Sequence, residues 1–169
     1  MGSANKIRVL FVCMGNICRS PAAEGVFLSL LEEEGLAGQF EVDSAGTGGW
    51  HQGKLADPRM RSAAAARGLT LESRARQIEA ADLQRFDLIL TMDDDNLASV
   101  RALDPSGRWQ HRIQALTNHC QRFNNTEVPD PYYGGEAGFE QVLDLLEDAC
   151  AGLLSSLRRQ RAQQQGQQQ

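Results

Sequence analysis

Long hydrophobic runs are missing from this sequence, and so is an excess of basic residues. No stretch approaches the roughly 20 apolar residues of a membrane-spanning helix, so we expect no membrane segment. The 17 Lys and Arg residues are outnumbered by 22 Asp and Glu, and no basic stripe runs along the chain. This balance disfavours nucleic-acid binding. The first apolar run has only a strand's length and lacks a small-residue cleavage site, so we expect no signal peptide.

Cysteine is also scarce, with four residues at positions 13, 18, 120 and 150. An even count could mean disulfides, but 169 residues can build a hydrophobic core without them. We therefore expect the protein to be located in the reducing cytoplasm. The cysteines and three histidines have no paired zinc-ligand spacing, so we expect no metal. The acidic run at 93–95 lacks the glycine and distal glutamate of a calcium loop and suits a helix start instead.

Predicted strands and helices alternate along the chain. Residues 6–12 form a near-continuous apolar run, typical of a strand buried on both faces. Further strands are expected at 40–45, 86–91 and within 111–116, and helices after residue 20, at 58–67, after residue 93 and at 139–157. The pattern predicts an α/β fold: a three-layer doubly wound sheet of about four parallel strands, in flavodoxin-like order. We expect a single domain over residues 1–157 and a disordered Gln-rich tail over 158–169.

The segment from Cys13 to Ser20 follows the first predicted strand, and ligands of such folds bind at the carboxyl ends of strands. A cysteine, five residues, an arginine and a serine can form a loop that wraps a phosphate. The guanidinium of Arg19 can grip two phosphate oxygens, and backbone N–H groups can take others. The sulfur of Cys13 would then lie behind the phosphorus, placed for nucleophilic attack.

Residues within this loop have individual roles. A helix N-terminus and Arg19 favour a Cys13 thiolate at neutral pH; the alternative for any lone cysteine is a buried structural thiol. The Ser20 hydroxyl could donate to that sulfur, and Ser20 could also cap the helix that starts at Pro21. Gly15 permits a backbone conformation that other residues resist. Asn16 could pin the loop through its amide, or be an ordinary turn residue.

The segment from Cys13 to Pro21 resembles the signature of the low-molecular-weight protein tyrosine phosphatases. The resemblance continues, in the family's order, through the segments at 43–47, 74–78, 87–97 and 130–135. It implies hydrolysis of phosphotyrosine and small aryl phosphates through a cysteinyl-phosphate intermediate, without a cofactor. It also implies a monomer whose partners are tyrosine-phosphorylated proteins, with a tyrosine kinase as one candidate.

The resemblance assigns roles to residues across the chain. Cys13 is the nucleophile, Arg19 binds the phosphate, and Asp130 is the general acid that later activates water. Without the resemblance, Asp130 before Pro131 would indicate only a turn. The substrate-binding residues are expected to be Met14, Gly15, Asn16, Ile17, Cys18, Ser20, Trp50, Tyr132 and Tyr133, with Ser44 supporting the loop. The three aromatic residues are expected to form walls at the mouth, although core packing is an alternative, above all for Trp50.

One position departs from the family pattern, since Ser73 stands where many members carry a histidine.

Three alternatives to a tyrosine phosphatase remain open. Thioredoxin-coupled arsenate reductases share the loop but use further cysteines after a middle strand, which residues 91–97 lack. Some bacterial relatives are protein arginine phosphatases and carry threonine where this chain has Ile17, which favours phosphotyrosine here. A redox-sensing phosphate-binding module could use a Cys13–Cys18 disulfide, and we treat this disulfide as regulation of the enzyme.

Overall fold

A computed structural model describes residues 6–132 and 134–167 of the protein. Its centre is a parallel sheet of four strands: β1 (Ile7–Cys13), β2 (Phe40–Gly46), β3 (Leu88–Thr91) and β4 (Ile113–Ala115). The strand order is β2-β1-β3-β4, with every neighbouring pair parallel. The predicted α/β fold with flavodoxin-like order is confirmed.

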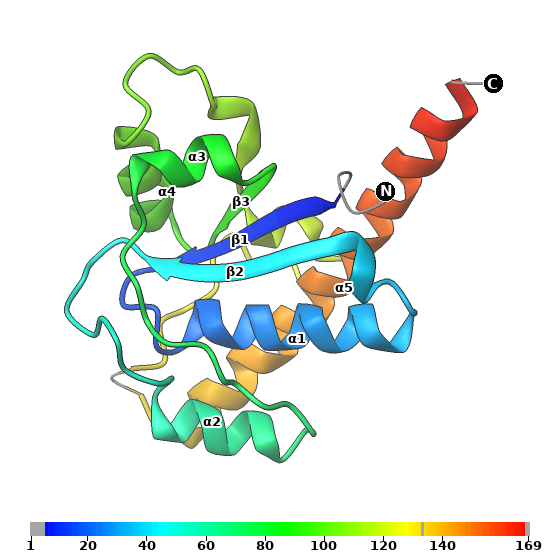
Figure 1. Cartoon of the computed structure of the whole chain (residues 1–169). Helices are drawn as coiled ribbons and strands as arrows, with labels where there is room; N and C mark the ends of the chain where they lie inside the picture. Colours follow the sequence, from blue (N-terminus) through cyan, green and yellow to red (C-terminus); the bar gives the residue numbers. More distant parts are fainter. Residues whose placement is uncertain (1–5, 133, 168–169) are drawn as a thin grey trace.

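Helices cover both faces of this sheet (Figure 1). On one face lie α1 (Arg19–Glu33), α5 (Glu136–Gln167) and, farther out, α2 (Pro58–Ala65). On the other face lie α3 (Ala80–Arg85) and α4 (Asp94–Ala102). Three short 3₁₀ helices, η2 (Ala37–Gln39), η3 (Gln110–Arg112) and η4 (Leu116–His119), complete the connections. Among the described residues, no helix is long and apolar enough to cross a membrane.

The alternation of side chains along β1 divides the core into two parts. Val9, Phe11 and Cys13 point into the larger cluster, which includes residues of α1 and α5. Leu10 and Val12 point into the smaller cluster under α3 and α4. Because a strand in a parallel sheet is buried on both faces, the run around residues 6–12 has no polar alternation. This packing against the helices on both faces of the sheet fixes the end of β1, and therefore the position of Cys13.

Two local predictions differ from the structure. Helix α1 begins at Arg19 after Cys18, with no side-chain cap, because the Ser20 hydroxyl faces Cys13 instead. The tail over 158–169 was predicted to be disordered, but it is helical through Gln167 as a continuation of α5, and residues 168–169 lie outside the described residues. Glutamine and arginine have good helix propensity, so a helix already held by its apolar stripe up to Leu157 can extend through them.

Candidate active site

The loop between β1 and α1 is held in a compact turn. Asn16 adopts a left-handed backbone conformation with a φ of 58°, which asparagine tolerates better than most residues. Main-chain bonds of 2.9 Å from Thr47 N to Cys13 O and from Gly48 N to Met14 O join this turn to the segment after β2. A Cβ atom on Gly46 would lie 2.8 Å from Met14 O, so only glycine permits this approach. The end of β2 therefore shapes the loop.

The sulfur of Cys13 is surrounded by hydrogen-bond donors. The backbone N–H of Asn16 donates to Sγ at 3.3 Å. The Ser20 hydroxyl lies 3.1 Å from the same sulfur. Since Ser20 Oγ already accepts a 2.7 Å bond from Asn16 Nδ2, its own proton is available for the sulfur or for Ala45 O at 3.4 Å. This arrangement stabilises negative charge on Cys13.

A hydrogen-bond network behind the loop fixes Asn16. Its Nδ2 also donates to Ser44 Oγ at 3.0 Å, and its Oδ1 accepts from Arg76 N at 3.0 Å. Ser44 Oγ donates in turn to Glu24 Oε1 at 2.6 Å. Burial raises the pKa of Glu24, while bonds from Ser44 and Ser73 act in the opposite direction. Ser73 thus contributes a hydroxyl to this network at the position where the family pattern has a histidine.

Arg19 is almost completely buried at the start of α1, with 2% of its surface exposed. Its Nη1 donates to Asp93 Oδ2 at 2.7 Å and to Val128 O at 2.9 Å, and its Nη2 lies 3.7 Å from Asp130 Oδ2. Burial alone would lower the pKa of Arg19, but Cys13, Asp93 and Asp130 together raise it. The guanidinium therefore stays charged beside the sulfur.

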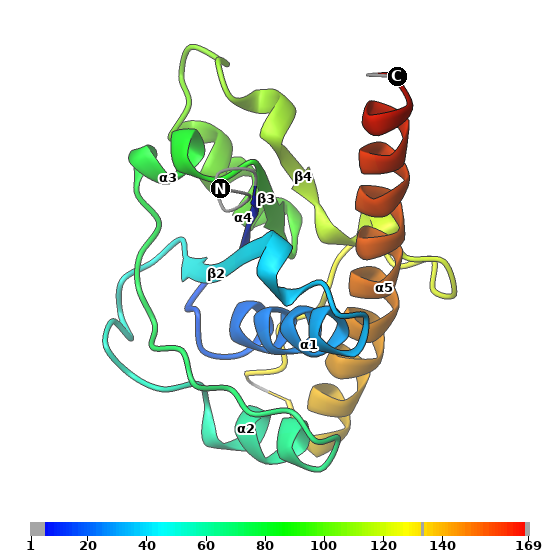
Figure 2. The ribbon, with the colours of Figure 1, turned by 45° about the vertical axis from the view of Figure 1, so that its right-hand side comes forward.

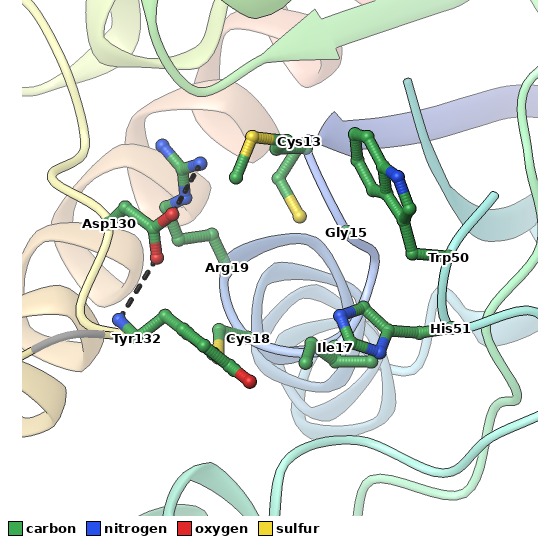
Figure 3. Close-up of a pocket in the computed structure, with 10 residues that line it drawn as sticks. Cys13, Gly15, Ile17, Cys18, Arg19, Trp50, His51, Asp130 and Tyr132 are labelled. Atoms are coloured by element: carbon green, nitrogen blue, oxygen red, sulfur yellow. Dashed lines mark hydrogen bonds and ion pairs between the residues drawn. The ribbon is translucent and has the colours of Figure 1, made fainter. Parts of the chain in front are cut away.

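The segment before α5 brings Asp130 to the same place. Val128 N donates to Met92 O at 2.7 Å, which anchors this segment beside the end of β3. Asp130 Oδ1 accepts a 3.0 Å bond from Tyr132 N, and its carboxyl is partly exposed (29%). Figure 3 shows Asp130 between Arg19 and Tyr132. A carboxyl in this position can exchange protons both with a bound ester and with water.

These groups meet in a cavity of about 300 Å³. Nine predicted residues line it: Cys13, Met14, Gly15, Ile17, Cys18, Arg19, Trp50, Asp130 and Tyr132. Trp50 is 70% exposed, so it is not a core residue, and it lies at the mouth. The side chains of Asn16, Ser20 and Ser44 do not line the cavity and belong to the network behind the loop. Tyr133 lies outside the described residues.

Sequence reasoning missed three contributors to the site. His51 lines the cavity, and its ring centroid lies 6.3 Å from that of Tyr132. Asp93 was expected as a helix cap; it does accept from Asn96 N at 2.8 Å, but its other oxygen binds Arg19. Arg59 donates to Tyr132 O at 3.0 Å. Of the three, only His51 had a signal in the sequence, because it follows Trp50 within the glycine-rich segment 46–53.

The described residues contain no group of three or more His, Cys, Asp or Glu side chains that could hold a metal ion. Cys18 is buried in the same cavity, and burial, Asp57, Cys13 and Asp130 raise its pKa to about 12. Cys18 is therefore a neutral thiol at physiological pH. The cavity thus holds one sulfur among hydrogen-bond donors and a second sulfur that stays protonated.

Comparison with known proteins identifies the family. The family model described as low molecular weight phosphotyrosine protein phosphatase matches residues 8–164. The chain belongs to this family. A relative from Synechocystis whose name places it in the same family is 48% identical over 151 residues, covering 89% of this chain and 96% of its own.

Solved structures agree with this assignment. A protein tyrosine phosphatase from Entamoeba histolytica, crystallised with Hepes in its active site, has a TM-score of 0.89 and 42% identity. The alignment covers 92% of this chain and 99% of that one. A Drosophila arginine phosphatase has a TM-score of 0.83 and 31% identity, with 89% and 98% covered. The low-molecular-weight phosphatase fold thus extends over nearly the whole chain.

Proposed function

We propose that this phosphatase hydrolyses phosphotyrosine with Cys13 as nucleophile, Arg19 as phosphate ligand and Asp130 as general acid. Membership of the family makes the chain a protein-tyrosine phosphatase, a hydrolase that acts on phosphoproteins. The observation that carries the assignment of residues is that Cys13, Arg19 and Asp130 line one cavity, with Asn16 N 3.3 Å from the sulfur. The Hepes in the Entamoeba active site carries a sulfonate, an anion similar in shape to phosphate.

The reaction has two steps. In the first, Cys13 Sγ forms a bond to phosphorus while the bond from phosphorus to the tyrosine oxygen breaks, and Asp130 gives its proton to the departing phenolate. In the second, Asp130 removes a proton from a water molecule, which attacks phosphorus and displaces the sulfur. Arg19 and the loop N–H groups balance the charge on the phosphoryl oxygens in both steps. Inorganic phosphate leaves and the thiolate is restored.

Side chains at the mouth support an aromatic substrate. Ile17, Trp50 and Tyr132 line the entrance, and apolar and aromatic groups suit a phenyl ring. The Drosophila arginine phosphatase shares the fold, so phosphoarginine is the second candidate. Ile17 at the cavity favours phosphotyrosine. Equal turnover of matched phosphoarginine and phosphotyrosine peptides would reject this preference.

The decisive test is hydrolysis of p-nitrophenyl phosphate and phosphotyrosine peptides by wild type and two variants. We expect vanadate to inhibit and chelators to have no effect. Cys13→Ser should abolish turnover, and full activity in this variant would rule out Cys13 as nucleophile. Asp130→Asn should slow poor leaving groups most, by about 10²–10⁴-fold for a lost general acid. Equal loss for all leaving groups would remove Asp130 from that role.

The cellular context follows from the same chemistry. We infer a location in the reducing cytoplasm, because Cys13 must stay a free thiol, and all four cysteines are free in the structure. The family resemblance favours a monomer. Its partners would be tyrosine-phosphorylated proteins, with a tyrosine kinase as one candidate. A Cys13→Ser trap that enriches no phosphotyrosine protein from source lysate would contradict this inference.

A further inference from the structure

A second, larger cavity lies at the opposite end of the sheet from the catalytic loop. It has a volume of about 760 Å³ and lies between the first residues of β1 and β3 and the C-terminal half of α5. Ile7 at the start of β1 lines it, whereas Cys13 at the end of β1 lies in the catalytic cavity. Seven residues of strand separate the two cavities by about 20 Å. Figure 2 shows α5 running beside the segment that follows β4, where η4 packs against it.

We propose that this second cavity binds a small phosphorylated molecule. Arg161 of α5 lines it, and one of its guanidinium nitrogens, Nη1, is buried without a hydrogen-bond partner among the described residues. A buried N–H without an acceptor is costly, and a cationic one more so. A phosphate oxygen is the acceptor that suits a guanidinium best. Arg158, one turn earlier, differs because it binds Glu34 at 3.3 Å on the surface.

The charges around the cavity favour an anion. Lys6 and Arg161 supply two positive charges. The only lining carboxylate among the described residues, Asp87, already accepts a 2.8 Å bond from Arg8 N. His119 Nε2 lies 2.6 Å from Gln114 Oε1, and burial lowers the pKa of His119, so this imidazole is neutral near pH 7. The two cations therefore outweigh the single carboxylate.

The other residues that line the cavity indicate what kind of molecule it would bind. Leu88, Leu153 and Leu157 supply an apolar wall, while Ser156 and Gln160 supply hydrogen-bonding groups. The volume of this cavity is within the range of pockets that bind drug-sized molecules, and it far exceeds the volume of a phosphate ion. The cavity would be filled by a molecule whose phosphate group lies beside Arg161 and Lys6. The rest of that molecule would be partly apolar and would contact the leucines. The Gln-rich segment thus contributes Arg161, Gln160 and Gln164 to a binding site.

The distribution of histidines provides a direct test. The chain has three, of which His51 lines the catalytic cavity while His111 and His119 line the second one. The imidazole NMR signals would therefore report on the two cavities separately. They are recorded on the Cys13→Ser protein, because this variant cannot turn over the probes. The probes are inorganic phosphate and cytidine 5′-monophosphate, each titrated to about 10 mM, a range that detects millimolar dissociation constants.

We expect cytidine 5′-monophosphate to shift the His111 and His119 signals, and phosphate to shift them more weakly. Arg161→Gln and Lys6→Gln should each weaken this binding about tenfold, as expected for a lost charge-assisted contact, without changing the His51 response. Arg158→Gln removes the same charge from the same helix and should bind as the parent does; melting curves check that each variant is folded. Shifts confined to His51, or equal weakening by Arg161→Gln and Arg158→Gln, would overturn the proposal.

Discussion

Arg59 holds Tyr132 by two contacts at once. Its Nη2 donates to the main-chain oxygen of Tyr132 at 3.0 Å, and its guanidinium carbon lies 5.4 Å from the centroid of the Tyr132 ring. Asp57, the N-cap of α2, fixes Arg59 through a 2.9 Å ion pair. Tyr132 N in turn donates to Asp130 Oδ1. The start of α2 therefore orients the proposed general acid although it does not touch it.

Arg59→Ala should impair leaving-group protonation because Asp130 would lose this support. We expect kcat for phenyl phosphate to fall about tenfold, and kcat for p-nitrophenyl phosphate to fall less, because its phenolate leaves with little need of a proton. Arg61→Ala is the matched control on the same helix, since Arg61 contacts Ala56 O and not the acid segment. An equal effect on both substrates, or an equal effect of the control, would exclude this positioning role.

Asp93 orients Arg19, the proposed phosphate ligand, and Asp93→Asn isolates that contribution. Asparagine caps helices as well as aspartate does, so the bond from Asn96 N should persist while the charge beside Arg19 is lost. We expect kcat/KM for p-nitrophenyl phosphate to fall about tenfold, the effect of losing one charge-assisted hydrogen bond. Asp95→Asn, in the same helical turn, should leave kcat/KM unchanged. Unaltered kinetics in Asp93→Asn would show that Arg19 needs no such partner.

The fold was predictable because its signals are local. The apolar run of β1, the loop from Cys13 and the stripe of α5 each lie within one segment, and alternation of strands and helices then leads to a parallel sheet. The contacts of Arg19 with Asp93 and Val128 join residues 74 and 109 positions apart, and no periodicity reports such pairs. Ser20 was given two roles from its residue type; the contact with Cys13 is confirmed, whereas the helix cap is wrong because the hydroxyl is already used at the sulfur.

Glu24 should make the stability of the protein depend on pH. Its pKa is raised by burial above the ordinary value of 4.5, so the folded state holds this proton more tightly than the unfolded state. The stabilisation is fully present below pH 4.5 and is lost as pH rises through the folded pKa. Glu24→Gln cannot ionise but keeps an acceptor for Ser44 Oγ, so its unfolding free energy should decline less with pH.

Urea unfolding of wild type and Glu24→Gln between about pH 4 and pH 8 measures this difference. The control is Glu33→Gln, an exposed position on the same helix, whose pH profile should follow that of wild type. If the difference between Glu24→Gln and wild type stayed constant over this range, Glu24 would not be the titrating group.

Cys18 should protect Cys13 from irreversible oxidation, at a rate that rises with pH. Peroxide oxidises the Cys13 thiolate to a sulfenic acid and is reduced to hydroxide. The Cys18 thiolate then attacks the Cys13 sulfur and displaces hydroxide, which closes a disulfide. Because burial and nearby carboxylates raise the pKa of Cys18 to about 12, its thiolate fraction grows about tenfold per pH unit up to that value.

Mass spectrometry after a peroxide pulse should therefore show disulfide closure accelerating about tenfold per pH unit above neutrality. Dithiothreitol should restore wild-type activity, since the thiol attacks the disulfide and regenerates both cysteines. Cys18→Ser cannot close the bond, so its Cys13 should proceed to sulfinic acid and recover little. Cys120→Ser, a half-buried cysteine outside the catalytic cavity, should behave as wild type. Equal recovery of Cys18→Ser and wild type, or closure insensitive to pH, would mean that another group protects Cys13.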